Sequence, residues 1–228
     1  MKAKNLLAVA ALCLFSGNAA AQETNYSSVY FQYNPSWLSY NVSGAKSDYL
    51  NGFTLGYTKS FGIAGDNSPL FLEVGANLQY AFKSKSESES RIIEGTKVSV
   101  DVTDRLNMLS LNVPVNFGYS IRLGDGLALN PYVGVRLRLN LLATETEKAT
   151  VKVGNSSDTE KETLNLFSKD DMGGSDNTWS RFQIAWRAGA KMVISEAFYV
   201  EAGYEMDFNR IAERTRFSSV NLGIGYVF

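Results

Sequence analysis

Histidine is absent from this 228-residue sequence, and cysteine occurs once, at Cys13. Without an imidazole the chain has no histidine general base or metal ligand, which excludes Ser-His and Cys-His catalysis and histidine-based metal sites. Cys13 lies in the N-terminal segment described below, so the remaining chain carries no thiol. Disulfides therefore give no information about the compartment in which the protein works.

An excess of charge of one sign is also missing, since 22 Lys and Arg stand against 23 Asp and Glu. A strongly basic domain would indicate a nucleic-acid partner, and we expect none here. Beyond the N-terminus, no apolar run approaches the roughly 20 residues that a membrane-spanning helix needs. Helical membrane proteins are therefore not predicted.

The N-terminal segment has the three parts of a secretory signal. Two lysines lie among the first four residues, residues 6–15 are apolar, and small residues follow up to Ala21. We expect a signal peptide of residues 1–21, cleaved after Ala21, and a single domain over 22–228. The alternative, a retained anchoring helix, would need a longer apolar core.

The rest of the chain alternates apolar and polar residues, which is the period of a β-strand whose successive side chains point to opposite faces. In the stretch VGVRLRLNL (133–141), one face is Val and Leu, and the other carries Arg136, Arg138 and Asn140. No convincing helical period follows the signal. The candidate strands are 28–34, 50–60, 70–82, 109–121, 133–141, 181–192, 200–208 and 220–228.

The connections between these strands alternate in length. The links at about 35–49, 83–105, 142–179 and 209–215 are mostly long and polar, whereas those at about 61–69, 122–126 and 194–197 are shorter and carry turn signals. Long links then meet at one rim and short links at the other, as in outer-membrane barrels. Link 83–105 still alternates and predicts either a polar hairpin or a mobile loop, and link 142–179 is expected to be partly disordered.

Two architectures share such alternation, the soluble β-sandwich and the membrane β-barrel. The apolar faces run for about the 9–11 residues that a tilted strand needs to cross a bilayer, whereas sandwich strands are usually about 5–6 residues long. Aromatic residues gather at the ends of the apolar faces, as in the two interfacial girdles of a barrel. They are Tyr80, Phe82 and Phe208 toward the long-link rim, and Tyr57, Tyr119, Tyr226 and Phe228 toward the other.

We therefore predict an all-β fold, an eight-stranded antiparallel up-and-down transmembrane β-barrel with a charged, side-chain-filled lumen, located in the cell outer membrane. An open sheet edge cannot remain unpaired in lipid, so the strand near 28–34 must pair with the strand near 216–228. The chain ends with Tyr226 and Phe228 on the outward face, which is typical of the C-terminal signal that barrel-assembly machinery reads. We expect that machinery and outer-membrane lipid to be partners.

Two consecutive segments, LNVPVNFGYSI and LNPYVGV, resemble the PorT-like family of outer-membrane β-barrels. The matching residues are Leu111, Val113, Pro114, Pro131, Tyr132 and Gly134. The resemblance covers the mature chain in layout and implies an eight-stranded barrel in a Gram-negative outer membrane. The type member of the family is connected with protein secretion, but no residues here would carry that role over.

Charged residues on the inward faces are the one group of side chains in the predicted barrel whose chemistry points to a specific role. The predicted lumen charge network is Glu73, Arg136, Arg138, Arg181, Arg187, Lys191, Glu201, Glu205 and Asp207. In one interpretation these residues are ion pairs that fill a narrow barrel, because eight strands leave an interior just wide enough for side chains and buried charges must be paired. In the other they line a narrow polar pore or a small-ligand site.

No catalytic, cofactor-binding or metal-ligating residues are predicted. Acid-pair chemistry by Glu201 and Glu205 would lie in a lumen too tight for a large substrate, and the acidic patches at 158–162 and 168–177 could hold Ca²⁺ or be solvated loop charges. We predict a membrane-anchored structural and surface-interaction protein whose external loops engage a surface ligand or protein, such as a host surface, a neighbouring protein or a glycan. The alternative is a narrow pore or transporter for small polar solutes.

Overall fold

The computed structural model describes residues 24–41, 47–63, 68–93, 96–154, 156–171, 178–195 and 197–228. The expected signal peptide and its cleavage site lie outside these residues. Every regular element in the described ranges is a β-strand. Within them, no helix has the length and apolar character needed to cross a membrane.

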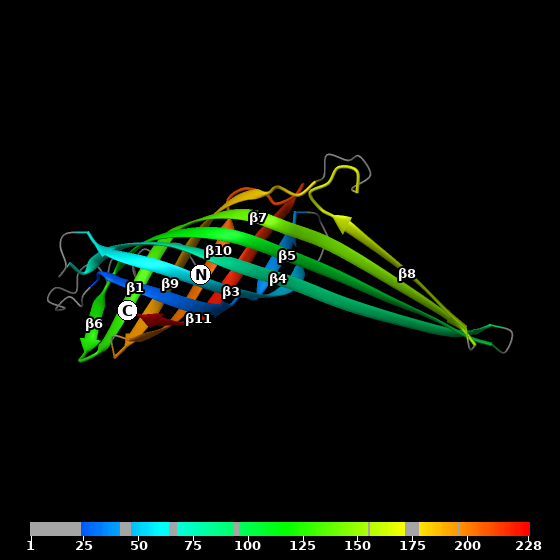
Figure 1. Cartoon of the computed structure of the whole chain (residues 1–228), viewed down its shortest axis with the longest axis horizontal. Coiled ribbons are helices and arrows are strands. Elements are labelled where there is room, and N and C mark those ends of the chain that lie inside the picture. Colours follow the sequence, from blue (N-terminus) through cyan, green and yellow to red (C-terminus); the bar gives the residue numbers. More distant parts are fainter. Residues whose placement is uncertain are drawn as a thin grey trace.

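The strands follow the predicted order closely (Figure 1). They are β1 (Tyr26–Tyr33), β2 (Ser36–Tyr40), β3 (Asp48–Gly62), β4 (Leu70–Ile93), β5 (Thr96–Tyr119), β6 (Ile121–Gly124), β7 (Leu127–Val153), β8 (Ser156–Asn165), β9 (Phe182–Ile194), β10 (Phe198–Asp207) and β11 (Thr215–Val227). Strands β1 and β2 act as one wall strand interrupted at Pro35, since both pair with β3 and with β11. Proline has no N–H to donate to a ladder, which accounts for the break.

The sheet closes on itself into a barrel of antiparallel strands. β1 pairs with β3 on one side and with β11 on the other, where Ser28 lies opposite Val227 and Tyr33 opposite Leu222. Counting β1–β2 as one, the described residues form a wall of eight strands in the order β1–β2, β3, β4, β5, β7, β9, β10 and β11. The predicted pairing of the first strand with the last is confirmed.

The two faces of the wall carry the predicted residue types. Val133 is 60% exposed on the outside, whereas Arg136 and Arg138 on the same strand are buried in the interior. Placing arginine on the lipid face at mid-bilayer would cost about 2–4 kcal/mol, so a register slip by one residue is strongly disfavoured. Apolar outside and polar inside is the arrangement of a membrane barrel and the reverse of a soluble sandwich.

Aromatic side chains on the outer surface meet near both rims. Tyr57 and Phe228 lie 6.4 Å apart between ring centroids near the short-connection rim, and Tyr80 and Phe82 lie 5.7 Å apart near the other. Tyrosine rings are amphipathic and favour the membrane–water interface, and girdles of aromatic residues flank the apolar band of membrane barrels. These pairs therefore mark the two edges of the membrane-spanning band.

Three strands continue well past the barrel into a projecting sheet (Figure 1). β4 and β5 stay paired up to Ile93 opposite Thr96, so the hairpin alternative for link 83–105 is confirmed. β7 continues to Val153 and pairs with β8, which returns along it to Asn165. Link 142–179 was expected to be partly disordered, and cross-strand pairing orders its residues 144–153 and 156–165. Residues 155 and 172–177 of that link lie outside the described ranges.

A β-bulge separates the barrel part of β7 from its extension. Leu109 lies opposite Leu142 while Ser110 lies opposite Asn140, so Leu141 is the extra residue and both leucines point outward. An inserted residue reverses which set of side chains faces inward. Beyond the bulge, Ala143 takes the buried position.

Candidate functional site

The barrel interior holds eight of the nine predicted charged residues, all buried. They are Glu73, Arg136, Arg138, Arg187, Lys191, Glu201, Glu205 and Asp207. Four are cations and four are carboxylates, so the buried charge of this set balances. A buried charge without a partner of opposite sign is very costly in free energy. An interior with this many charges is therefore stable only if cations and carboxylates balance.

Arg181 is the exception, and its assignment to the lumen is wrong. Its side chain is exposed, and its guanidinium carbon lies 4.2 Å from the ring centroid of Phe167. β9 begins one residue later, at Phe182, so strand alternation no longer determines the direction of the Arg181 side chain. It stacks on an aromatic ring at the long-connection rim instead.

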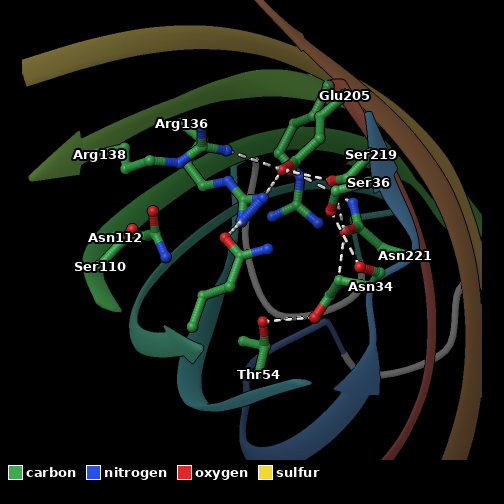
Figure 2. Close-up of polar contacts among 12 residues, drawn as sticks. Asn34, Ser36, Thr54, Ser110, Asn112, Arg136, Arg138, Glu205, Ser219 and Asn221 are labelled. Atoms are coloured by element: carbon green, nitrogen blue, oxygen red, sulfur yellow. Dashed lines mark hydrogen bonds and ion pairs between the residues drawn. The ribbon is translucent and has the colours of Figure 1, made fainter. Parts of the chain in front are cut away.

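Glu205 is the centre of the outer half of the charge network (Figure 2). Its carboxylate pairs with Arg136 and with Nη2 of Arg138 at 3.2 Å, and it accepts hydrogen bonds from Ser219 Oγ at 2.8 Å and Asn221 Nδ2 at 3.3 Å. These partners come from β7 and β11, whereas Glu205 lies on β10. Glu205 therefore connects side chains across the lumen.

Arg138 is held by charge and by an aromatic ring. Its Nη1 contacts Asp207 Oδ2 at 3.2 Å, and its guanidinium carbon lies 4.3 Å from the ring centroid of Phe217. The Arg138 side chain is only 1% exposed. A planar guanidinium can stack and bond in the same position, which a lysine could not do.

A chain of neutral hydrogen bonds continues from this cluster to the opposite wall (Figure 2). Asn34 donates to Asn221 Oδ1 at 2.6 Å and accepts from Thr54 Oγ1 at 2.6 Å. These residues had no role in the sequence interpretation, although they occupy inward positions of their strands. Asn34 follows β1 directly, which places its amide at the break between β1 and β2.

The inner half of the network is built on Glu73 and Glu201. Lys191 on β9 forms an ion pair with Glu73 on β4, and Asn116 Nδ2 donates to Glu73 Oε1 at 2.9 Å. Glu201 pairs with Arg187 at 3.1 Å and accepts hydrogen bonds from Tyr132 Oη and from Gln32 Nε2, the latter at 2.9 Å.

Close packing of large side chains against glycines fills the remaining space. A Cβ atom added to Gly189 or to Gly203 would lie 2.7 Å from Tyr132 Oη, closer than real Cβ atoms approach other atoms. A Cβ on Gly225 would lie 2.2 Å from Cζ of Tyr199. The inward glycines therefore provide the room in which the tyrosines lie.

An apolar cap lies above the charged interior at the long-connection rim. Its buried members are Leu38, Leu50, Ala81, Leu106, Met108, Ala143, Leu166, Ile211 and Phe217. Leu166 and Ile211 come from connections, not from wall strands, and are 2% and 0% exposed. Sequence reasoning missed this cap; the only signal was isolated apolar residues within polar links.

Beside the cap, a cavity of about 180 Å³ is lined by acidic and basic groups. Burial opposes ionisation of Asp48, but hydrogen bonds from Lys83 and Tyr40 and the Lys83 charge outweigh burial and lower the pKa of Asp48. Desolvation at the cavity, followed by repulsion from Asp104, raises the pKa of Glu145. In the described ranges, no group of three or more cysteine or acidic residues is arranged to hold a metal ion.

A closed antiparallel barrel with an apolar outer wall and a paired, charged interior defines an integral outer-membrane β-barrel protein. The sequence profile of the "Outer membrane protein beta-barrel domain" family matches residues 7–228, and the chain belongs to this family. Its location is the outer membrane. The match is to this broad family, and it does not show membership of the narrower PorT-like group.

Several solved structures are similar to this chain at low identity. Ail, the attachment invasion locus protein of Yersinia pestis, is 18% identical with a TM-score of 0.38, over 90% of this chain and 99% of Ail. Neisserial surface protein A is 14% identical with a TM-score of 0.42, over 89% and 97%. The outer membrane enzyme PagL is 13% identical with a TM-score of 0.40, over 85% and 97%. No curated protein matches the sequence significantly.

Proposed function

We propose that this protein is a non-conducting membrane anchor that presents a rigid external sheet for interaction at the cell surface, without catalysis. The observation that carries the proposal is the continued pairing of β4, β5, β7 and β8 beyond the barrel, out to Val98 opposite Val153 and Val153 opposite Ser156. Flexible links would need no such pairing. A paired sheet offers a preorganised surface, which lowers the entropy lost on binding.

The composition of β8 favours binding through a face of this sheet and not through strand addition. β8 is the outer edge of the extension, and its sequence SSDTEKETLN is almost entirely exposed and polar. Charged edge strands discourage pairing with further strands. The partner is therefore expected to contact side chains, and host surfaces, neighbouring proteins and surface glycans remain the candidate classes.

The packed lumen supports the absence of conduction. The buried ion pairs on Glu73, Glu201 and Glu205 and the apolar cap above them leave little room for a hydrated solute path. Planar-bilayer recordings of the refolded protein test this, and we expect silence. Steady openings that change in Arg187→Ala or Glu201→Ala would favour the alternative, a narrow pore for small polar solutes.

The surface role is tested by shortening the external sheet without disturbing the barrel. Deleting 85–104 and 145–164, each replaced by an Asn-Gly turn, ends both hairpins at existing pairs, Ser84 with Arg105 and Thr144 with Asn165. Leu166 of the apolar cap is retained. We expect the shortened protein to keep heat-modifiable gel migration and to lose binding to arrays of glycans and matrix proteins that the full chain binds. Equal binding by both forms would contradict the proposal.

Membership of the narrower PorT-like group stays a proposal. Two of its matching residues have packing roles: Tyr132 bonds Glu201, and a Cβ on Gly134 would lie 2.2 Å from the carbonyl oxygen of Val115. These contacts suggest that the shared residues are kept for the structure of the barrel, and they give no reason to propose a role in secretion. Recognition of Tyr226 and Phe228 by barrel-assembly machinery is likewise proposed, and replacing Phe228 with Ser should slow assembly in cells.

A further inference from the structure

The projecting sheet has two faces of opposite charge. One face continues the lipid-facing surface of the barrel and is rich in Ser and Thr; we call it the basic face. Its cations are Lys97, Arg105, Lys148, Lys152 and Lys161, against a single acid, Asp101. The other, acidic face continues the barrel interior. Its acids are Glu87, Glu89, Asp104, Glu145, Glu147, Asp158, Glu160 and Glu162, against the cations Lys83, Lys85 and Arg91.

Three cations of the basic face converge on one cleft. Arg105, Lys148 and Lys161, with the hydroxyls of Thr103 and Thr146, line a space of about 320 Å³ between β5, β7 and β8. Lys148 lies directly opposite Lys161. Like charges in that position destabilise a sheet, so folding alone does not favour this arrangement.

No described acidic side chain forms an ion pair with these three cations. The one acid of the basic face, Asp101, is bound to Lys152 Nζ at 3.1 Å. Arg105, Lys148 and Lys161 are all exposed. Three cations with nearby hydroxyl donors have the chemistry that binds phosphate, through charge and through several N–H and O–H donors.

The height of the cleft above the membrane identifies the source of the phosphate. The apolar outer band ends at Leu109 on β5, which lies opposite Tyr80, and Tyr80 Oη in the aromatic girdle donates to Asn107 Oδ1 at 2.7 Å. Arg105 is two residues farther out than Asn107. Its Cα lies about 13 Å along the strand from Leu109 at about 3.3 Å per residue, or about 9 Å along the membrane normal at the usual tilt near 45°. Lys148 and Lys161 lie at the level of Thr103, two residues farther out, which is about 14 Å along the normal on the same geometry.

Headgroups form a layer about 5–8 Å thick above the hydrocarbon core in simple phospholipids, so the Cα atoms of these three cations lie at and above the outer edge of that layer. Long arginine and lysine side chains reach toward this layer while their stems cover apolar surface. We propose that Arg105, Lys148 and Lys161 form a binding site for the phosphate groups of an outer-leaflet glycolipid of the membrane that the barrel spans. This site would hold the external sheet at a defined angle to the membrane, a role distinct from the proposed surface interaction.

The test compares two double variants that remove the same charges from opposite faces. R105Q/K148Q changes the basic face, and K85Q/R91Q removes one Arg and one Lys from the acidic face, where both are exposed and paired with neighbouring glutamates. Each protein is refolded in a neutral detergent at about 0.15 M salt and checked by heat-modifiable gel migration. Diphosphorylated lipid A is then titrated in, and bound lipid is counted by native mass spectrometry.

We expect wild type and K85Q/R91Q to bind lipid A within about twofold of each other, and R105Q/K148Q to bind about 25-fold more weakly, since each juxtamembrane charge contributes a factor of about five. Dephosphorylated lipid A should bind wild type as weakly as lipid A binds R105Q/K148Q. Equal binding by wild type and a correctly folded R105Q/K148Q would overturn the site. If millimolar inorganic phosphate displaced lipid A, the site would be a general phosphate site and the proposal of a lipid ligand would be wrong. If heparin oligosaccharides bound more strongly than lipid A, the ligand of the basic face would be a soluble sulfated glycan.

Discussion

Lys191 and Glu73 are 118 positions apart in the sequence and form an ion pair across the barrel lumen. Lys191 projects from β9 and Glu73 from β4, so the pair joins walls that are not neighbours in the sheet. Both side chains are 2% exposed or less. Such a contact couples the two halves of the barrel through charge, in addition to the ladder of backbone hydrogen bonds.

Removing one partner of this pair should be far more damaging than removing both. Lys191→Met leaves the Glu73 carboxylate buried without its cation, which we expect to lower the free energy of unfolding by about 3–5 kcal/mol. The double variant Lys191→Met with Glu73→Gln should recover most of that loss. Urea unfolding in lipid vesicles, followed by tryptophan fluorescence, measures both, and additive losses would contradict the coupling.

Gly203 is required by the hydroxyl of Tyr132. Gly203→Ala places a Cβ 2.7 Å from Tyr132 Oη and forces the ring to move, which should cost about 1–3 kcal/mol. In a Tyr132→Phe background the same change should cost markedly less, because the clashing oxygen is gone. A double-mutant cycle on unfolding free energies reports this non-additivity. Equal costs in both backgrounds would show that the nearby backbone, and not Tyr132, restricts the position.

The apolar cap can be loosened without unfolding the barrel. Leu166→Ala removes a buried side chain that a connection contributes, at a cost of about 2–5 kcal/mol if the cap does not collapse around the gap. We expect faster proteolysis near 166–180 on intact cells, together with unchanged heat-modifiable gel migration. Phe182→Ala, on the outer surface of β9, is a control of similar character that should leave proteolysis unchanged.

The raised pKa of Glu145 predicts the sign of a pH effect. A carboxyl whose pKa is raised by folding destabilises the folded state at neutral pH, and the penalty disappears as pH falls below its unfolded value of about 4.3. Glu145→Gln should therefore stabilise the protein at pH 7 by less than about 1 kcal/mol, because solvent screens this accessible group. Urea titrations should show that this gain in the free energy of unfolding vanishes near pH 4. A gain that instead grows as the pH falls would contradict the prediction.

Some of these features were predictable because they depend on neighbouring residues alone. Strand alternation is local, so the outward Val133 and the inward Arg136 and Arg138 follow from the order of residues together with the cost of placing arginine in lipid. The need to close the sheet follows in the same way, since an unpaired edge is intolerable in a bilayer. The direction of the Arg181 side chain was not predictable in this way, because Arg181 precedes the first residue of β9 and strand alternation does not extend beyond a strand's ends.

The sequence by itself therefore determined the wall, namely its strand count, the side of each strand that meets lipid, and the presence of both cations and carboxylates inside. Only the tertiary structure decided which cation meets which carboxylate, where the bulge at Leu141 reverses the faces of β7, and how Leu166 and Ile211 close the outer mouth. It alone decided between a hairpin and a mobile loop for link 83–105, and it alone revealed that this hairpin and link 142–179 pair into one sheet with a basic and an acidic face. The physical reason is that side-chain direction is a property of one strand, whereas contacts depend on register between strands that are far apart in the chain.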